Sequence, residues 1–358
     1  MLQDKIRNLV ERAIAEEGEG AVQVAVFQRG EPVVDVTVAP ESVPLTDKSL
    51  IAFFSTGKGL AATAVHRLVE RGVLSWDAPL AEYWPEFAAN GKSGILLRHA
   101  MNHTAGLPMM PESPVPVGDW QGMCDYLSAA TPVHAPGAHR YYHAITYAWL
   151  LGETASRADG RPFSQILRDE VIDPLGLENL FIGVPADRLA DCIDTDTLPE
   201  PPAATTPEPA PAPDPIAARA IPEWVKPLED WINRSDVRSA CIPASNGYGT
   251  ARDVARHYAA LLGEGVDGVK LLSDETLAVA TRWDPATDGV IPGNGCWGLG
   301  YALQGPDEQP GVRFGHGGYG GSTSFADRRY GLAVSVLKSR LGGDLSARIV
   351  QVIDAHMQ

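Results

Sequence analysis

Segments with the alternating apolar pattern of β-strands lie near both ends of the chain, and mainly helical patterns lie between them. Residues 21–38 contain two alternating runs of valine on either side of an Arg-Gly-Glu-Pro turn, which predicts a β-hairpin. Four more segments of strand character, separated by glycine turns, follow near the C-terminus at 295–303, 312–321, 322–330 and 331–339. The simplest structure that satisfies this distribution is a sheet assembled from both ends of the chain.

Helical periodicity marks both termini and the middle of the chain. Apolar residues recur with helical spacing in 1–20, 250–265 and 345–358, and most signals between Ser55 and about residue 180 are helical. We therefore predict an α/β (α+β) fold. An antiparallel sheet from the N- and C-terminal segments is flanked by helices and carries an inserted, mainly helical domain.

The predicted sheet domain comprises 1–54 and 245–358, and the predicted helical domain comprises 55–244. Within the helical domain, residues 198–224 are rich in proline and alanine. That composition predicts an exposed excursion without regular structure.

The net charge limits the partners. The chain has 358 residues and a formal charge of -16, so nucleic acid and anionic membranes would repel it. The N-terminal segment has the pattern of an amphipathic helix rather than of a secretion signal, and no apolar run is long enough to span a membrane. The four cysteines form no CxxC pair, which predicts reduced thiols. We expect a cytoplasmic protein that acts on a small molecule.

Ser55 and Lys58 stand at the predicted start of a helix, directly after three bulky apolar residues. Serine at this place is a common helix cap, whereas a lysine three residues later on the same face can take a proton from a nucleophilic hydroxyl. The spacing alone allows both interpretations. The same S-x-x-K spacing at Ser335 and Lys338 lies in a predicted strand, where residues three apart point to opposite faces, so we assign it no chemistry.

Two further segments have the composition of a site. One contains Tyr141, Tyr142 and His143 ahead of a helical run, and the other contains His316 among four glycines, which let a backbone approach a ligand closely. In their order along the chain, these motifs resemble the serine β-lactamase and penicillin-binding-protein superfamily. The resemblance is to the class C-like branch with the family VIII carboxylesterases, and it rests on segments 53–87, 97–108, 136–153, 242–262 and 314–336.

The resemblance implies that Ser55 is an acyl-accepting nucleophile, that Lys58 is its base, and that a tyrosine shares the proton transfers. A strict Y-x-N register selects Tyr141, with His143 in the asparagine place. The esterase-like YHA variant selects Tyr142, which we prefer, with His143 beside it as a substrate-binding candidate.

The third family element, K-T-G in many relatives, is His316-Gly317-Gly318 here. Imidazole is a weaker and pH-dependent cation compared with an ammonium group, which favours a neutral ester or amide over a β-lactam carboxylate. The next backbone N–H, that of Tyr319, is the expected second oxyanion donor beside that of Ser55.

Two other hydrolase classes, zinc hydrolases and α/β-hydrolases, fit the sequence less well. The pairs His99/His103 and His139/His143 have a zinc-like spacing but lack the glutamate of H-E-x-x-H, and no serine has the flanking glycines of an α/β-hydrolase. We therefore predict a serine hydrolase, most closely a carboxylesterase of class EC 3.1.1, without metal or cofactor. The alternatives are a transacylase that passes the acyl group to an amine or alcohol, and a non-catalytic penicillin-recognising or scaffold protein. Neither the physiological substrate nor the oligomeric state follows from the sequence.

Overall fold

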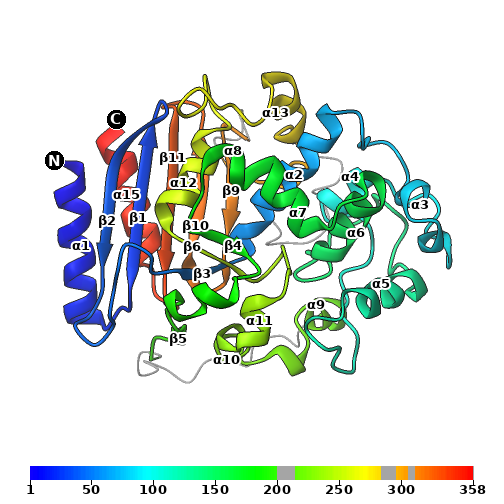
Figure 1. Cartoon of the computed structure of the whole chain (residues 1–358), viewed down its shortest axis with the longest axis horizontal. Helices are drawn as coiled ribbons and strands as arrows, with labels where there is room; N and C mark the ends of the chain where they lie inside the picture. The colour runs from blue at the N-terminus through cyan, green and yellow to red at the C-terminus, as the bar shows by residue number, and fades with distance from the viewer. Residues whose placement is uncertain (200–213, 284–295, 305–310, 358) are drawn as a thin grey trace.

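The computed structural model describes residues 1–199, 214–283, 296–304 and 311–357. Its main sheet has seven strands in the order β2-β1-β11-β10-β9-β8-β7, and every neighbouring pair is antiparallel. The strands are β1 (Val22–Gln28), β2 (Glu31–Val38), β7 (Cys296–Trp297), β8 (Ala302–Gln304), β9 (Arg313–Gly317), β10 (Thr323–Asp327) and β11 (Leu332–Lys338). Both ends of the chain thus build one sheet, as predicted (Figure 1).

The sheet joins the two ends of the chain through β1 and β11. Val22 pairs with Lys338 at one end of this ladder and with Val38 in the hairpin to β2. The hairpin turn places Arg29 and Gly30 at φ 52° and 84°, the left-handed conformations that a tight two-residue turn requires. The predicted hairpin is therefore confirmed.

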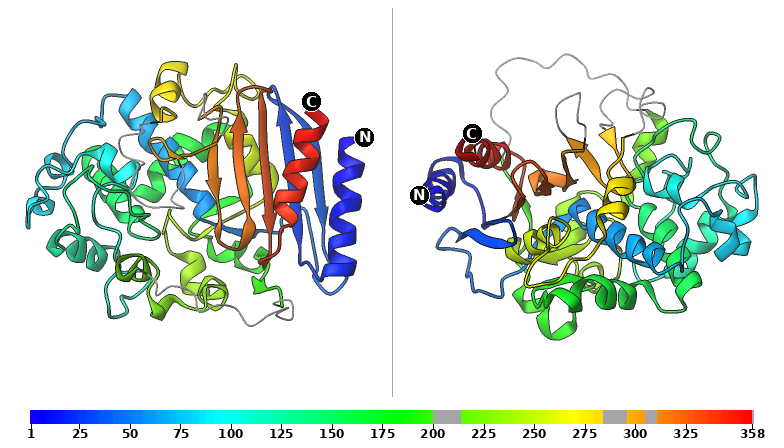
Figure 2. Two further views of the ribbon diagram at one scale, coloured as in Figure 1. Left: turned by 180° about the vertical axis from the view of Figure 1, so that it is seen from behind. Right: turned by 90° about the horizontal axis from the view of Figure 1, so that it is seen from above.

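Helices cover both faces of the main sheet. Helices α1 (Leu2–Glu17) and α15 (Leu345–Met357) lie side by side on one face, where they bury the alternate valines of β1, β2 and β11 (Figure 2). Helix α12 (Ala251–Ala259) packs on the opposite face against β1, β10 and β11. Because β1 is covered on both faces, its first six residues are all buried.

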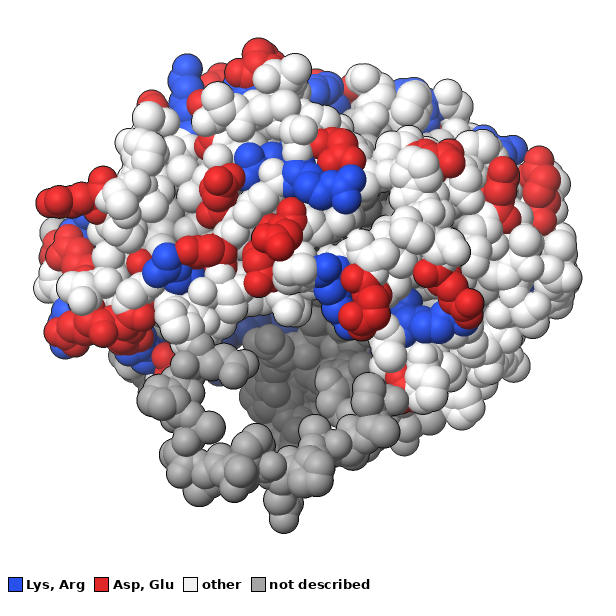
Figure 3. Space-filling model, turned by 90° about the horizontal axis from the view of Figure 1, so that it is seen from below, with Lys and Arg blue, Asp and Glu red and all other residues white. Residues whose placement is uncertain are grey.

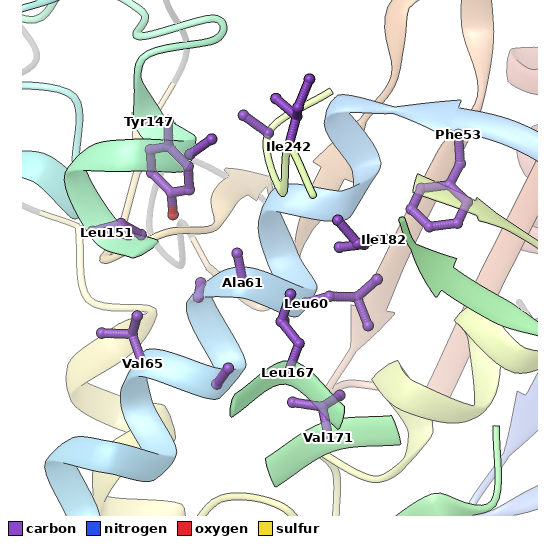
Figure 4. Close-up of a cluster of buried hydrophobic side chains, with 14 of the residues drawn as sticks. Phe53, Leu60, Ala61, Val65, Tyr147, Leu151, Leu167, Val171, Ile182 and Ile242 are labelled. Atoms are coloured by element: carbon purple, nitrogen blue, oxygen red, sulfur yellow. The ribbon is translucent and has the colours of Figure 1, made fainter. Parts of the chain in front are cut away.

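Helix α2 (Lys58–Glu70) passes through the centre of the molecule, beside the sheet. Leu60, Ala61 and Val65 pack against side chains of α6 (Tyr147–Asp159), α7 (Phe163–Leu167) and the small sheet described next (Figure 4). Ten of its residues are buried, so α2 is held rigidly from all sides.

A second sheet, which the sequence did not predict, stands directly before the start of α2. It contains β3 (Ile51–Phe54), β6 (Gly247–Gly249) and β4 (Leu180–Ile182) in the order β3-β6-β4. Phe53 of β3 lies over the two glycines of β6, where a Cβ atom at Gly247 would come within 1.9 Å of its ring. These glycines therefore allow β6 to approach the segment that precedes Ser55.

Short elements complete the described part of the chain. The remaining helices are α3 (Leu80–Tyr83), α4 (Leu97–Met101), α5 (Trp120–Ala129), α8 (Asp173–Leu175), α9 (Pro215–Ala220), α10 (Leu228–Asn233), α11 (Ser235–Ser239) and α13 (Asp274–Ala280). Short 3-10 helices are η1 (Ser55–Gly57), η2 (Pro85–Ala88), η4 (Ala186–Asp191), η5 (Glu223–Val225) and η6 (Tyr319–Gly321), and η3 (Arg168–Ile172) is a π-helical turn. Strands β5 (Asp196–Thr197) and β12 (Arg340–Leu341) pair in parallel.

The proline-rich segment 198–224 is predicted to lack regular structure, and part of that prediction is wrong. Residues 200–213 lie outside the described residues. Beyond them α9 forms, because Asp214 caps its first turn, proline occupies the first helical position, and good helix formers follow. The division into domains at residues 54 and 244 stays a prediction.

Candidate active site

Ser55 lies at the junction between β3 and α2. Phe54 precedes it with φ 45° and ψ -129°, a conformation that non-glycine residues rarely adopt and that costs on the order of 1–3 kcal/mol. The backbone then turns through η1 into α2, which leaves the Ser55 side chain partly exposed. Backbone strain next to a reactive side chain is common in catalytic sites, because the surrounding packing holds the residue in place.

The Ser55 hydroxyl pairs with Lys58 rather than with the helix backbone. Lys58 Nζ lies 3.1 Å from Ser55 Oγ, and no side-chain hydrogen bond caps the start of η1 or α2. The geometry thus favours the nucleophile-and-base interpretation over the helix-cap interpretation.

The charge state of Lys58 follows from its surroundings. The residue is fully buried, and burial lowers the pKa of its amine well below the usual value. Nζ also donates to the backbone carbonyls of Ala144 and Ala244, each at 2.7 Å. A neutral amine has two N–H groups, and these two carbonyls take both. The nitrogen lone pair is then left for the proton of Ser55.

Tyr142 lies against Ser55 and Lys58. The side chain is partly buried in the cavity wall, and Lys58 Nζ is 4.9 Å from its ring centroid. Burial raises the pKa of the phenol, and a hydrogen bond with Ser55 offsets only part of that rise. Tyr142 therefore carries its proton at neutral pH.

His316 completes this group. Its Nδ1 lies 2.6 Å from the Gly317 carbonyl oxygen and must donate to it, so Nε2, 3.3 Å from the Tyr142 hydroxyl, is an acceptor. Burial, followed by the nearby Lys58, lowers the pKa of His316 to about 3. The imidazole is consequently neutral at pH 7 and supplies no positive charge to the site.

The glycines after His316 bring β9 against the nucleophile segment. A Cβ atom at Gly318 would come within 2.5 Å of the Phe53 carbonyl oxygen, whereas one at Gly317 would meet nothing closer than 3.9 Å. The Tyr319 ring is half exposed and packs on Phe54, with ring centroids 5.9 Å apart. The segment from His316 to Tyr319 therefore forms one wall of the site.

The structure does not bring His143 into this group. Its Nδ1 donates to the Tyr141 carbonyl at 2.7 Å, and its Nε2 accepts the Leu107 N–H at 3.0 Å. Both ring nitrogens are thus occupied by backbone, and His143 does not line the cavity beside Ser55. Tyr141 is partly buried, and its side chain bonds with Asp214 rather than with Ser55.

Two aromatic residues to which the sequence assigned no role beside the nucleophile pack against Tyr142. The rings of His103 and Trp297 lie 4.7 Å and 5.7 Å from the Tyr142 ring, centroid to centroid. His103 is fully buried with φ 66°, and the sequence indicated for it only a zinc-like spacing from His99. Neither residue type at that place carries a catalytic signature, so sequence reasoning had no signal for their role.

Ser55 opens into a mostly apolar cavity of about 410 Å³, called the inner cavity here. It is lined by Tyr142 and His316, by Ser245, and by the apolar side chains Phe54, Ile145, Ile221, Leu228, Trp231 and Trp297. A wider outer hollow of about 1190 Å³ shares Tyr142, Ala144, Ile221, Leu228 and Tyr319 with it. An apolar chamber of this size with a few convergent polar groups fits a small organic ligand.

The described residues offer neither a zinc site nor a membrane-spanning helix. Where the structure describes the chain, no group of three or more His, Cys, Asp or Glu side chains is arranged to hold a metal ion. No helix in the described ranges is long and apolar enough to cross a membrane. On the face shown in Figure 3, acidic and basic side chains are intermingled over the described surface.

A family model described as Beta-lactamase matches residues 6–356. This chain belongs to the β-lactamase family. It is 33% identical over 320 residues to the esterase/beta-lactamase LipL of Mycobacterium tuberculosis, in an alignment that covers 80% of this chain and 68% of LipL.

Solved structures agree with this assignment to the β-lactamase family. A penicillin-binding-protein homologue from Caulobacter crescentus superposes with a TM-score of 0.84 at 30% identity, covering 99% of this chain and 97% of that one. A family VIII carboxylesterase gives a TM-score of 0.84 at 27% identity with the same coverage. The predicted family, fold class and enzyme class are confirmed by these relatives.

Proposed function

We propose that this chain is a serine esterase that forms an acyl-enzyme on Ser55 with small, uncharged ester substrates. The observation that carries the proposal is the pairing of Ser55 with a fully buried Lys58 whose amine is hydrogen-bonded by two carbonyls. No carboxylate of the described residues pairs with Lys58, and burial lowers the pKa of its amine well below the usual value, which suits the amine to act as a base.

Acylation divides the proton transfers between two groups. Lys58 accepts the Ser55 proton as Oγ attacks the ester carbonyl. The N–H groups of Ser55 and Tyr319 stabilise the oxyanion that forms. Tyr142, protonated because its pKa is raised, donates its proton to the departing alkoxide and recovers one from Lys58. In total, one proton moves from the Ser55 hydroxyl to the leaving alcohol.

Deacylation reverses these transfers with water in place of the alcohol. Water gives its proton to Lys58 by way of Tyr142 and attacks the acyl carbonyl, and Ser55 Oγ regains a proton as it leaves. No carboxylate base is needed for this step. Amide substrates fit the same scheme, with a poorer leaving group.

The preference for a neutral substrate follows from the wall of the inner cavity. Penicillins and cephalosporins carry a carboxylate, and a permanent cation in the place of His316 would hold it. Here that place has a neutral imidazole, and the rest of the described lining is mostly apolar. An ester without a charge is desolvated in such a cavity at a much lower cost than a carboxylate.

The experiment that tests this proposal compares kcat/KM for 4-nitrophenyl butyrate with kcat/KM for a penicillin and a cephalosporin. We expect the ester to be favoured by orders of magnitude. Comparable values for the ester and a β-lactam would contradict the proposed substrate class. Adding amines or alcohols to the ester assay then reveals whether water or another nucleophile accepts the acyl group, which separates an esterase from a transacylase.

A further inference from the structure

Ser245 is a polar side chain of the inner cavity that the proposed mechanism does not use. Ser55, Tyr142 and His316 bond with one another or with Lys58, as described above. Ser245 also lines the cavity and is only 8% exposed. Its hydroxyl makes no hydrogen bond within the described residues. The hydroxyl oxygen is not fully buried, so it remains in contact with solvent. The hydroxyl is therefore reachable from the cavity and has no hydrogen-bond partner among the residues that the structure describes.

The backbone holds Ser245 in a fixed place. Its N–H donates to the Ile242 carbonyl at 2.9 Å. The Asn246 side chain closes the same turn, because it accepts the Ile242 N–H at 3.0 Å and donates to the carbonyls of Val237 and Ala240, each at 2.6 Å. Asn246 is fully buried, so the turn is rigid.

The same turn sets Ser245 beside the reacting atoms. The carbonyl of the preceding residue, Ala244, lies 2.7 Å from Lys58 Nζ, which itself lies 3.1 Å from Ser55 Oγ. A substrate whose carbonyl carbon is attacked by Ser55 therefore places the atoms next to that carbonyl in the cavity that Ser245 also lines.

A hydroxyl that is nearly buried without a partner is costly, and native proteins usually pair such a group with a ligand or water. We propose that Ser245 is a specificity-determining residue that hydrogen-bonds a polar atom of the acyl group close to the reacting carbonyl. The preferred substrates are esters whose acyl group carries an oxygen or nitrogen within a few atoms of that carbonyl, in place of a plain hydrocarbon. This inference rests on the proposed esterase function.

Two esters of the same size test it. In 4-nitrophenyl methoxyacetate an ether oxygen replaces one methylene of 4-nitrophenyl butyrate. The ratio of the two kcat/KM values, each divided by the rate constant for hydroxide-catalysed hydrolysis, isolates the contribution of the enzyme. Ser245→Ala should lower this ratio about 3- to 10-fold, the worth of one neutral hydrogen bond. Ser245→Thr keeps a hydroxyl and should retain the wild-type ratio.

The outcomes separate the inference from the proposed function. If Ser245→Ala lowers kcat/KM equally for both esters, Ser245 has only a structural role and the inference is wrong. Ser245→Gly provides a second variant without the hydroxyl, should the alanine variant fold poorly. A wild-type protein that hydrolyses neither ester would overturn the proposed esterase function and this inference together.

Discussion

Replacing Tyr142 by phenylalanine removes the one group that the account assigns to protonation of the leaving alcohol. The change deletes a hydroxyl that bonds with Ser55 and lies 3.3 Å from His316 Nε2, and it leaves the ring packing intact. Loss of a positioned proton donor should lower kcat by about 10²–10⁴. The free energy of unfolding should fall by only about 1 kcal/mol, because one neutral hydrogen-bonding hydroxyl is lost.

Tyr141→Phe is the matched control. Tyr141 is the neighbouring tyrosine, but its hydroxyl bonds with Asp214 rather than with Ser55. Its replacement should change kcat by no more than about twofold, because its hydroxyl takes no part in the proposed proton transfers. Steady-state hydrolysis of 4-nitrophenyl butyrate gives kcat for both variants, and thermal unfolding verifies that each is folded. A large loss in Tyr141→Phe with a nearly normal Tyr142→Phe would refute the assignment of Tyr142.

Two further predictions concern the site wall and the pH dependence of stability. Gly318→Ala should lower kcat/KM at least tenfold, because its Cβ atom would come within 2.5 Å of the Phe53 carbonyl and displace the wall, whereas Gly317→Ala has space and should retain most activity. Equal effects of the two alanines would contradict this close approach. Burial lowers the pKa of His66 from 6.5 to about 4, because the folded protein disfavours the charged imidazole. The unfolded chain therefore binds a proton more readily, and the free energy of unfolding falls as the pH is lowered from 6.5 toward 4. At pH 5 this loss is about 2 kcal/mol. In urea unfolding, the free energy of unfolding of His66→Gln should therefore fall less between pH 7 and pH 5 than that of the wild-type protein, by about the same amount. An equal fall in both proteins would disprove this role of His66.

The main sheet was predictable because its strands leave a periodic signal. Alternating valines in β1 and β2 face α1 and α15, so the pattern in the sequence indicates which face of the sheet is buried. The second sheet has no such alternating pattern, since β6 is Gly-Tyr-Gly and β4 has only three residues. Likewise α9 was obscured by the surrounding prolines, although Asp214 supplied a capping signal.

The site was predictable where a side chain carries the chemistry. The pair Ser55 and Lys58, Tyr142, and His316 come from three separate segments, and the structure brings them together. Sequence could not decide between two adjacent tyrosines, because their directions depend on the turn before α6. It also gave no sign of the two carbonyls that bind Lys58, since any residue type can supply a backbone oxygen.

The central claim is that Ser55 is the nucleophile that becomes acylated. Intact-mass spectrometry of the acyl-enzyme tests this claim most directly. Wild-type protein mixed rapidly with 4-nitrophenyl butyrate and quenched in acid should gain the mass of one butyryl group, and the adduct should decay as water releases it. Ser55→Ala should stay folded, show no adduct and give no turnover. A butyryl adduct or continued turnover in folded Ser55→Ala would contradict the assignment of Ser55 as the nucleophile.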